Sequence, residues 1–398
     1  MSRKKNDRSA KMNDNPTRRR TFLLSTAAVG TFGIAGCIGE EGEDPTDDAD
    51  ENGDGMGDDD PFDDEEEDMA DDGEGEGEGD GDGFVIRVGT ASSGSATFAH
   101  AQATQAAIEN HGNTDIVQYS TQETAGMEAN LYIHDEDQVD AVSSFNIQVI
   151  EARDGEGGFE EDPVDPDNLP YQGWLANVAN LHWIAREDTD IETMDDFEGH
   201  RIWPIQPGFG TRAVTEDLLR SAGMWDDLDI VNMGTGDIAG ALEEGNVDAM
   251  ATYGTNAEVL PGWVTEVDTR ADMRDVSMND EFRQAIEDFE GVEYDQYDQF
   301  GWEQDLQVRD EDGIEYYEAP VQFFFGPHVP SDAVYEVARV VHEHIDDIRD
   351  ADPGHYDHSD VENMVSYTLD DYPVHPGAAE FYQDEGIWDD SWEIGEER

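Results

Sequence analysis

The sequence repeats one short pattern in two places, Gln138-Val139-Asp140-Ala141-Val142 and Asn246-Val247-Asp248-Ala249-Met250. In both copies small and apolar residues surround one aspartate, which fits a short buried strand. Each copy also follows a segment whose apolar spacing predicts a helix, 123–133 in the first case and 238–244 in the second. A helix that leads into a buried strand is the closing part of a βαβ unit, so the sequence predicts two such units.

The segments before the two copies follow the same order of elements. The first copy is preceded by a strand at 84–89, a polar loop, a helix at 97–110 and a strand at 115–119. The second is preceded by a strand at 201–205, the loop Pro207-Gly208-Phe209-Gly210-Thr211, a helix at 211–222 and a strand at 229–233. This match predicts an α/β fold with two βαβαβ lobes. The alternative is coincidence, because the tetrapeptides are common.

The composition is strongly acidic. The 398 residues include 99 Asp+Glu and 21 Lys+Arg, a net charge of -78. This excludes ordinary binding to nucleic acids or anionic membranes, which needs a positive surface. All lysines lie before residue 37, a distribution typical of proteins from extreme halophiles. We expect residues 84–398, with 72 acids and 13 Arg, to loosen below roughly 0.5–1 M salt, where screening weakens. Eight Trp and 13 Tyr argue against an acidic disordered chain.

The N-terminus has the features of an export signal. Arginines at 18–20 precede an apolar run, Phe22–Ala35, that is too short to span a bilayer as a helix. The order Arg-Arg-x-Phe-Leu resembles a twin-arginine (Tat) signal, and Ile34-Ala35-Gly36-Cys37 resembles a lipobox. We therefore expect residues 1–36 to be a Tat-type signal peptide and Cys37, the single cysteine, to carry a lipid anchor on the outer face of the cell membrane.

Residues 37–83 are expected to be a lipidated cysteine followed by an acidic, disordered tether, because 25 of the 46 residues after Cys37 are acidic. Asp48-x-Asp50-x-Asn52-Gly53 with Asp59 at the twelfth place resembles a calcium loop. A chance match in so acidic a stretch is the favoured interpretation.

The folded part, 84–398, carries no catalytic signature such as GxSxG, HExxH or a P-loop lysine, so we expect no enzyme activity and no cofactor. The histidine pairs His342/His344 and His355/His358 are expected to be solvated, and no metal site is predicted. Gly208-x-Gly210-x-x-Ala213 fits a dinucleotide fingerprint, but no acid follows at the tip of the next strand. A nucleotide-using enzyme is therefore the least favoured class.

Glycine and hydroxyl residues after strands suggest a different chemistry. A Gly-rich loop that opens a helix presents free N–H groups and a positive dipole end to an anion. Two such loops facing each other would hold a small acidic ligand between the lobes. The candidate ligand-binding residues are Ser93, Ser95, Thr97, Ser143, Ser144, Asn146, Gly208, Gly210, Thr211, Arg212, Tyr253 and Asn256. Arg212 has an alternative interpretation, a surface arginine paired with acids.

Several sequence blocks, taken in order, resemble the TAXI-type solute-binding subunits of TRAP transporters. These blocks are Val88–Gly94, Asp195–Ile202, Pro207–Arg212, Gly245–Ala249 and Val374–Tyr382. With the N-terminal features, the chain is identified by resemblance as a haloarchaeal, Tat-exported lipoprotein of this family. Two positions depart from the family pattern: Gly94-Ser95-Ala96-Thr97-Phe98 replaces Gly-Gly-Thr-Tyr-Tyr, and Phe209 replaces a serine.

The resemblance implies a two-lobe type II periplasmic-binding-protein fold with the ligand in the interlobe cleft. It implies a small organic anion, such as glutamate or a dicarboxylate, delivered to a TRAP permease in the membrane. Lobe 1 is expected at about 84–185 and 316–398 and lobe 2 at about 186–315, with a hinge near Ala185–Asp190. Residues 264–315 could add a strand or form a surface insertion. The alternative function is a ligand-binding sensor lipoprotein coupled to a signalling partner instead of a permease.

Overall fold

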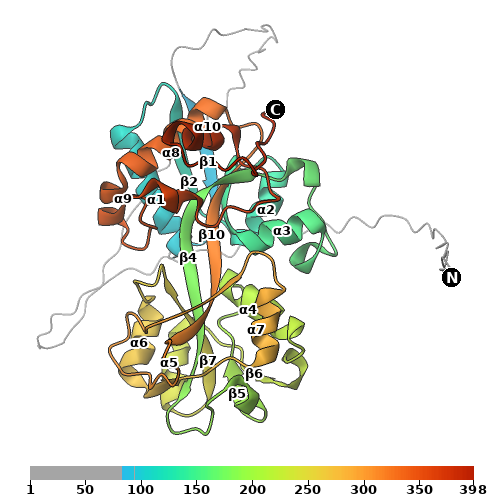
Figure 1. Cartoon of the computed structure of the whole chain (residues 1–398), viewed down its shortest axis with the longest axis vertical. Helices are drawn as coiled ribbons and strands as arrows, with labels where there is room; N and C mark the ends of the chain where they lie inside the picture. The colour runs from blue at the N-terminus through green and yellow to red at the C-terminus, as the bar shows by residue number, and fades with distance from the viewer. Residues whose placement is uncertain (1–82, 94) are drawn as a thin grey trace, which may run out of the picture. The chain divides into compact units, whose positions relative to one another are not determined.

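The computed structural model describes residues 83–93 and 95–398 (Figure 1). The predicted signal peptide, the lipid-attachment residue Cys37, the acidic tether and its calcium-like loop lie outside the described residues.

The first lobe is built on a βαβαβ unit. Its elements are β1 (Phe84–Gly89), α1 (Ala96–His111), β2 (Val117–Gln122), α2 (Met127–Asp135) and β3 (Ala141–Phe145). The strands are parallel and lie in the order β2-β1-β3. A helix between two parallel strands returns the chain to the end of the sheet from which the next strand can run in the same direction.

The second lobe repeats the unit. Its elements are β5 (Arg201–Trp203), α4 (Gly210–Ser221), β6 (Asp229–Ile230), α5 (Thr235–Glu243) and β7 (Ala249–Thr255). The strands are again parallel, in the equivalent order β6-β5-β7. The predicted α/β class and the predicted repeat of element order are both confirmed.

A pair of arginine–aspartate contacts explains the repeated sequence pattern. In the first lobe, Asp140 accepts hydrogen bonds from the backbone N, Nε and Nη2 of Arg87, at 2.7–2.8 Å. In the second lobe, Asp248 accepts the same three bonds from Arg201, at 2.7–2.9 Å. Each aspartate stands just before the third strand of its unit and binds the first strand, so each pair locks the parallel register of its own lobe.

Two long strands join the lobes. β4 (Tyr171–Arg186) and β10 (Ile314–Phe325) are antiparallel neighbours and run together from one lobe to the other (Figure 1). The order of the sheet is β2-β1-β3-β10-β4-β7-β5-β6. β10 pairs with β3 from Val321 onward, and β4 pairs with β7 from Ala179 onward. The lobe boundaries expected at 185/186 and 315/316 therefore fall inside continuous strands.

The remaining elements extend both lobes. Residues 264–315 contribute most of α6 (Gly262–Arg270), then β8 (Met273–Asp275), α7 (Asp280–Glu287) and β9 (Glu293–Tyr297). β8 pairs with β4 and β9 with β10, so this region adds strands to the sheet. The first lobe also has α3 (Asn146–Asp154), α8 (Ser331–Glu343), α9 (Ile345–Ala351) and α10 (Pro376–Glu385). None of the described helices is both long and apolar enough to cross a bilayer.

The two joining strands also form the centre of the core. All twelve residues of β10 are buried, as are the fourteen central residues of β4. Trp174 packs against Phe323 and Phe325, and Trp183 packs against Phe197 and Phe282. Strands covered on both faces lack the alternation of apolar and polar residues that marks a half-buried strand. The sequence around these strands therefore carries little periodic signal.

Candidate functional site

The start of α4 is the strongest candidate for binding an anion. The loop before it needs the positive φ of Gly208, +89°, and the N-cap residue Phe209 makes no side-chain capping bond. Thr211, in the first turn, is 6 % exposed, and its hydroxyl has no hydrogen-bond partner among the described residues. A helix N-terminus with an unused buried hydroxyl offers N–H and O–H donors to a negatively charged group.

β3 of the first lobe meets this helix start. The Phe145 ring lies so close to Gly210 that a Cβ at that position would be 2.5 Å from it. Ser143 lies two residues earlier in β3, so its side chain points to the same face as Phe145. Its hydroxyl is fully buried, and we find no partner for it in residues 83–93 and 95–398. The structure thus brings β3 against Gly210 through Phe145, with Ser143 two residues away on the same face of the strand and Thr211 next to Gly210.

Arg212 is already engaged by its own lobe. One guanidinium nitrogen, Nη1, donates to the carbonyl of Ile205 at 2.9 Å, and Nε donates to Glu216 at 3.2 Å. The guanidinium also lies over the ring of Trp225, 5.1 Å from its centre. Arg212 therefore pairs with an acid, as in the alternative interpretation, but it is buried and not on the surface, and its bond to Ile205 anchors the loop before α4.

The polar loop after β1 is satisfied internally. Ser95 is the N-cap of α1 and accepts a bond from Phe98 N at 3.2 Å, while its Oγ lies 3.2 Å from the Thr97 hydroxyl. Ser93 is exposed, and its backbone N donates to Glu123. Ser95 therefore caps α1, and the Thr97 hydroxyl contacts this capping residue.

Two predicted asparagines hold chain segments together. Asn146 donates to the carbonyl of Tyr367 at 2.9 Å and accepts from Gln322 at 2.7 Å. Asn256 has a positive φ of +56° and accepts from Val178 N at 2.8 Å, while its amide donates to Gly354 O at 2.9 Å. The side-chain oxygens of both residues accept hydrogen bonds from within the protein. Both residues therefore stabilise the joint between the lobes, the region where β4 and β10 pass from one lobe to the other.

Ser144 and Tyr253 complete the predicted set. Ser144 is buried in β3, and its hydroxyl donates to Gln148 at 3.3 Å. Tyr253, in β7, packs edge-on against Trp263 with ring centres 5.8 Å apart, and burial raises its pKa. Ser144 therefore faces its own lobe, and Tyr253 packs against α6.

Sequence reasoning missed a buried carboxylate at the joint. Glu318 of β10 accepts hydrogen bonds from Asn180 (2.8 Å), Tyr297 (2.9 Å) and Tyr367 (2.8 Å). Its partners come from β4, β9 and the segment before α10, so no local motif could reveal the cluster. Three donors can satisfy a buried carboxylate without a cation. Glu318 thus fixes four segments where the strands pass between the lobes.

An acidic cavity lies next to this cluster. Its volume is about 450 Å³, and Asn146, Pro320 and Tyr367 line one side. Acidic residues line the other side: Glu287, Asp288, Glu290 and Glu293. Its lining contains no basic residue among the described ones, so the cavity does not suit the expected anion.

Two carboxyls from opposite lobes share a second interlobe cavity. Burial raises the pKa of Glu151 in α3 to about 7, with a further contribution from Asp217 of α4. Burial and the neighbouring Glu216 raise the pKa of Asp217 to about 6. Because burial and nearby acids make both carboxyls harder to ionise, the contact between α3 and α4 is sensitive to pH.

The expectation that His355 and His358 are solvated is wrong. Both side chains are fully buried, and His358 Nε2 lies 2.8 Å from the carbonyl of Leu175 in β4. His355 packs edge-on against His100 of α1, and burial lowers the pKa of His355 to about 4. Neutral imidazoles can pack in a core. The loop that contains them covers β4, although its Pro, Gly and Asp content suggests an exposed segment.

A family model described as the NMT1-like family matches residues 88–386, about three quarters of the sequence. The chain therefore belongs to the NMT1-like family. No curated protein is similar enough in sequence to match it.

Solved structures with a similar fold include several periplasmic or extracellular binding proteins. The periplasmic aliphatic sulphonate binding protein of Escherichia coli is 16% identical, with a TM-score of 0.34, over 67% of this chain and 72% of that one. A probable amino-acid ABC transporter extracellular-binding protein of Bacillus subtilis is 13% identical, with a TM-score of 0.40, over 68% and 96%. The alkanesulfonate-binding protein of Xanthomonas axonopodis pv. citri, bound to MOPS, is 11% identical, with a TM-score of 0.36, over 79% and 97%.

Proposed function

We propose that this protein is an extracytoplasmic solute receptor that binds a small organic anion between its two lobes and delivers it to a TRAP-type permease. The observation that carries the proposal is the start of α4, where the buried Thr211 hydroxyl has no partner among the described residues. The TRAP assignment rests on the sequence blocks that resemble TAXI-type subunits. The lipid anchor at Cys37 and the outer-face location rest on the N-terminal signal.

The ligand class follows from the donors at this site. Backbone N–H groups and hydroxyls can hold a carboxylate without adding net positive charge, which suits a protein of net charge -78. Arg212 orients the loop in this proposal, since its guanidinium is bonded to Ile205 and Glu216. Glutamate and small dicarboxylates are the first ligands to test.

The test starts with a screen of carboxylates by thermal shift in multimolar KCl, followed by calorimetry with the best ligand. We then compare wild type with Thr211→Glu, and with Thr265→Glu in the exposed first turn of α6 as the matched control. Losing one charge-assisted contact is expected to cost about 1.5–3 kcal/mol, which weakens binding by roughly 10- to 150-fold. Thr265→Glu should bind like wild type.

Circular dichroism shows whether Thr211→Glu folds, which is expected because a carboxylate at a helix N-terminus is locally favourable. Wild-type affinity in a folded Thr211→Glu protein would place the ligand elsewhere. Absence of any stabilising carboxylate from the screen would contradict the proposed ligand class.

A further inference from the structure

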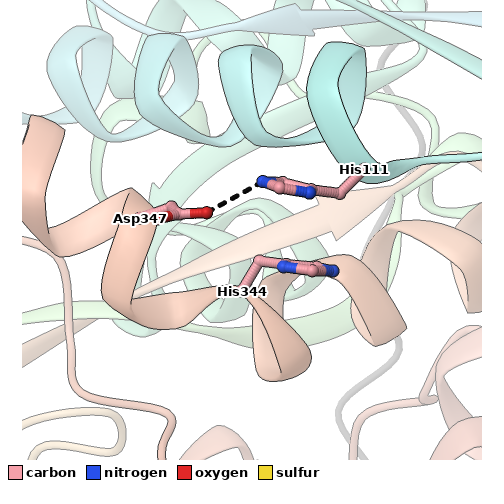
Figure 2. Close-up of side chains that lie close together, drawn as sticks. All are labelled: His111, His344 and Asp347. Atoms are coloured by element: carbon pink, nitrogen blue, oxygen red, sulfur yellow. Dashed lines mark hydrogen bonds and ion pairs between the residues drawn. The ribbon is translucent and has the colours of Figure 1, made fainter.

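A group of potential metal ligands lies on the first lobe, outside the proposed ligand site. His111 is the last residue of α1, His344 stands between α8 and α9, and Asp347 lies in the first turn of α9 (Figure 2). One potential ligand atom from each residue lies within 4.8 Å of those of the other two. His344 and Asp347 are three residues apart, so a single helical turn presents both toward the end of α1.

His111 already contacts both of the other side chains. His111 Nε2 lies 2.8 Å from Asp347 Oδ2, and the His111 and His344 rings stack with centres 3.8 Å apart and planes within 6° (Figure 2). An ion pair between His111 and Asp347 would by itself tie α1 to α9. It gives no role to His344, whose ring nitrogens have no hydrogen bond to another described residue.

We propose that His111, His344 and Asp347 form a binding site for a divalent transition metal such as Zn²⁺. Two imidazoles and a carboxylate are a donor set that Zn²⁺ and its neighbours in the first transition row accept. Ca²⁺ and Mg²⁺ prefer oxygen ligands, so they compete poorly for two imidazoles. The site is of the three-ligand type, which leaves the remaining coordination positions to water.

The surroundings favour a cation and allow the necessary movement. Asp346, Glu343 and Asp350 are exposed acids on the same two helices, and they raise the local concentration of divalent cations. The nitrogen lone pairs of an imidazole lie in the plane of its ring. Because the His111 and His344 rings are stacked, one of them must rotate before both can direct a nitrogen toward the same ion. His111 is exposed and His344 half-buried, which leaves room for that rotation.

Sequence analysis predicted no metal site and expected His342 and His344 to be solvated. The structure separates these two histidines, because His342 Nδ1 contacts the carbonyl of His358 at 2.8 Å. The neighbour of His344 is instead His111, which lies 233 positions earlier in the sequence. Ligand spacing within a short motif could therefore not reveal the site.

The experiment measures Zn²⁺ binding to the full-length protein in multimolar KCl at neutral pH, after chelator treatment, by competition with a chromophoric chelator. Wild type is compared with His344→Gln and His111→Gln. The matched control is His200→Gln, which changes a histidine of the second lobe that pairs with Asp190 at 3.1 Å and with Asp248 at 3.9 Å. We expect one tight Zn²⁺ in wild type and the control, and affinity lowered by at least roughly 10- to 100-fold in the other two variants.

Two further readouts distinguish a metal site from a structural ion pair. Zn²⁺ should raise the melting temperature of wild type and of His200→Gln but not that of His344→Gln, which keeps the His111–Asp347 bond. Zn²⁺ affinity should fall in mild acid, because ligating imidazoles must be neutral. Equal Zn²⁺ affinity in wild type and His344→Gln would assign the ion to other acids and overturn the proposal, as would a wild type that binds no Zn²⁺.

Discussion

The starts of α1 and α4 occupy equivalent places in the two lobes, yet their donors differ. In α1, the hydroxyls of Ser95 and Thr97 lie 3.2 Å apart, and Ser95 caps the backbone of Phe98. In α4, the N-cap residue is Phe209, and the buried hydroxyl of Thr211 has no partner within the part of the chain that the structure describes. The start of α1 is stabilised by its own side chains, whereas the start of α4 has a hydroxyl donor, that of Thr211, with no partner among the described residues.

A helix start can contribute either to the stability of its lobe or to the binding of a ligand. A capped helix start contributes to the stability of its lobe, because its side chains satisfy the first-turn N–H groups. An uncapped start with a buried hydroxyl costs stability until another molecule supplies the missing acceptor. We therefore expect changes in the first lobe to affect folding and changes at α4 to affect binding.

The largest expected effect comes from the arginine–aspartate pairs of the two lobes. Asp140→Asn should lower the free energy of unfolding by about 3 kcal/mol, and Asp248→Asn by about 2 kcal/mol. The order follows burial, because the side chain of Asp140 is 5% exposed and that of Asp248 is 11% exposed. Urea unfolding in multimolar KCl measures both, and a larger loss for Asp248→Asn would contradict the comparison.

The Arg87–Asp140 pair also makes the stability of the protein depend on pH. Burial alone would raise the pKa of Asp140, but hydrogen bonds from Arg87 and His328 hold it well below its usual range. A lowered carboxyl pKa stabilises the fold above the unfolded-state value, and this contribution is lost as pH falls through the folded-state value. The difference between wild type and Asp140→Asn should therefore stay constant near neutral pH and shrink only in strong acid.

A smaller effect is expected where α3 of the first lobe meets α4 of the second. The raised pKa values of Glu151, about 7, and Asp217, about 6, mean that the folded state holds protons that the unfolded state has released. Stability should therefore fall by about 1 kcal/mol as pH rises from the usual carboxyl range to about 7, after allowance for partial exposure. Melting temperatures across this range measure the slope.

Glu151→Gln should flatten this slope, because the amide does not titrate. Glu160→Gln, a change at an exposed acid in the same lobe, should keep it. An unchanged slope in Glu151→Gln would show that the pH sensitivity arises elsewhere.

The smallest expected effects test the two helix starts directly. Thr97→Val removes the hydroxyl that contacts Ser95 and should cost about 0.5–1.5 kcal/mol of stability, with ligand affinity unchanged. Thr211→Val replaces an unpartnered hydroxyl with a methyl group of similar size, so stability should be equal or higher while ligand affinity falls. Calorimetry and thermal melting of both variants give the four values. The opposite assignment of effects would place the anion at α1.

The sequence predicted the repeated units because their signals are local. The strand at 84–89 was predicted with the bounds of β1, and the predicted helix 211–222 differs from α4 by one residue at each end. The sequence also showed the aspartates of the repeated pattern, but it did not predict their hydrogen bonds to Arg87 and Arg201. Periodic apolar spacing and helix-stop glycines identify such elements without knowledge of the rest of the chain.

The joint between the lobes could not be predicted in the same way. β4 and β10 are buried on both faces, so they lack alternation, and the donors around Glu318 come from distant segments. Asn146 and Asn256 resemble ligand residues because they follow strands, but their partners, Tyr367 and Gly354, are remote in sequence. A polar side chain after a strand does not reveal whether the protein itself supplies its acceptor.

The pairing of β4 with β10 also sets when this protein can fold. Leu181 pairs with Tyr317 and Tyr171 with Phe325, so more than 130 residues of chain separate the partners. Pairing over such distances slows folding, because loop entropy is lost before the contacts form. Each lobe includes part of β10, so neither can complete its sheet before the ribosome has passed Ile314. A chain that ends before Ile314 therefore leaves an open sheet edge in both lobes.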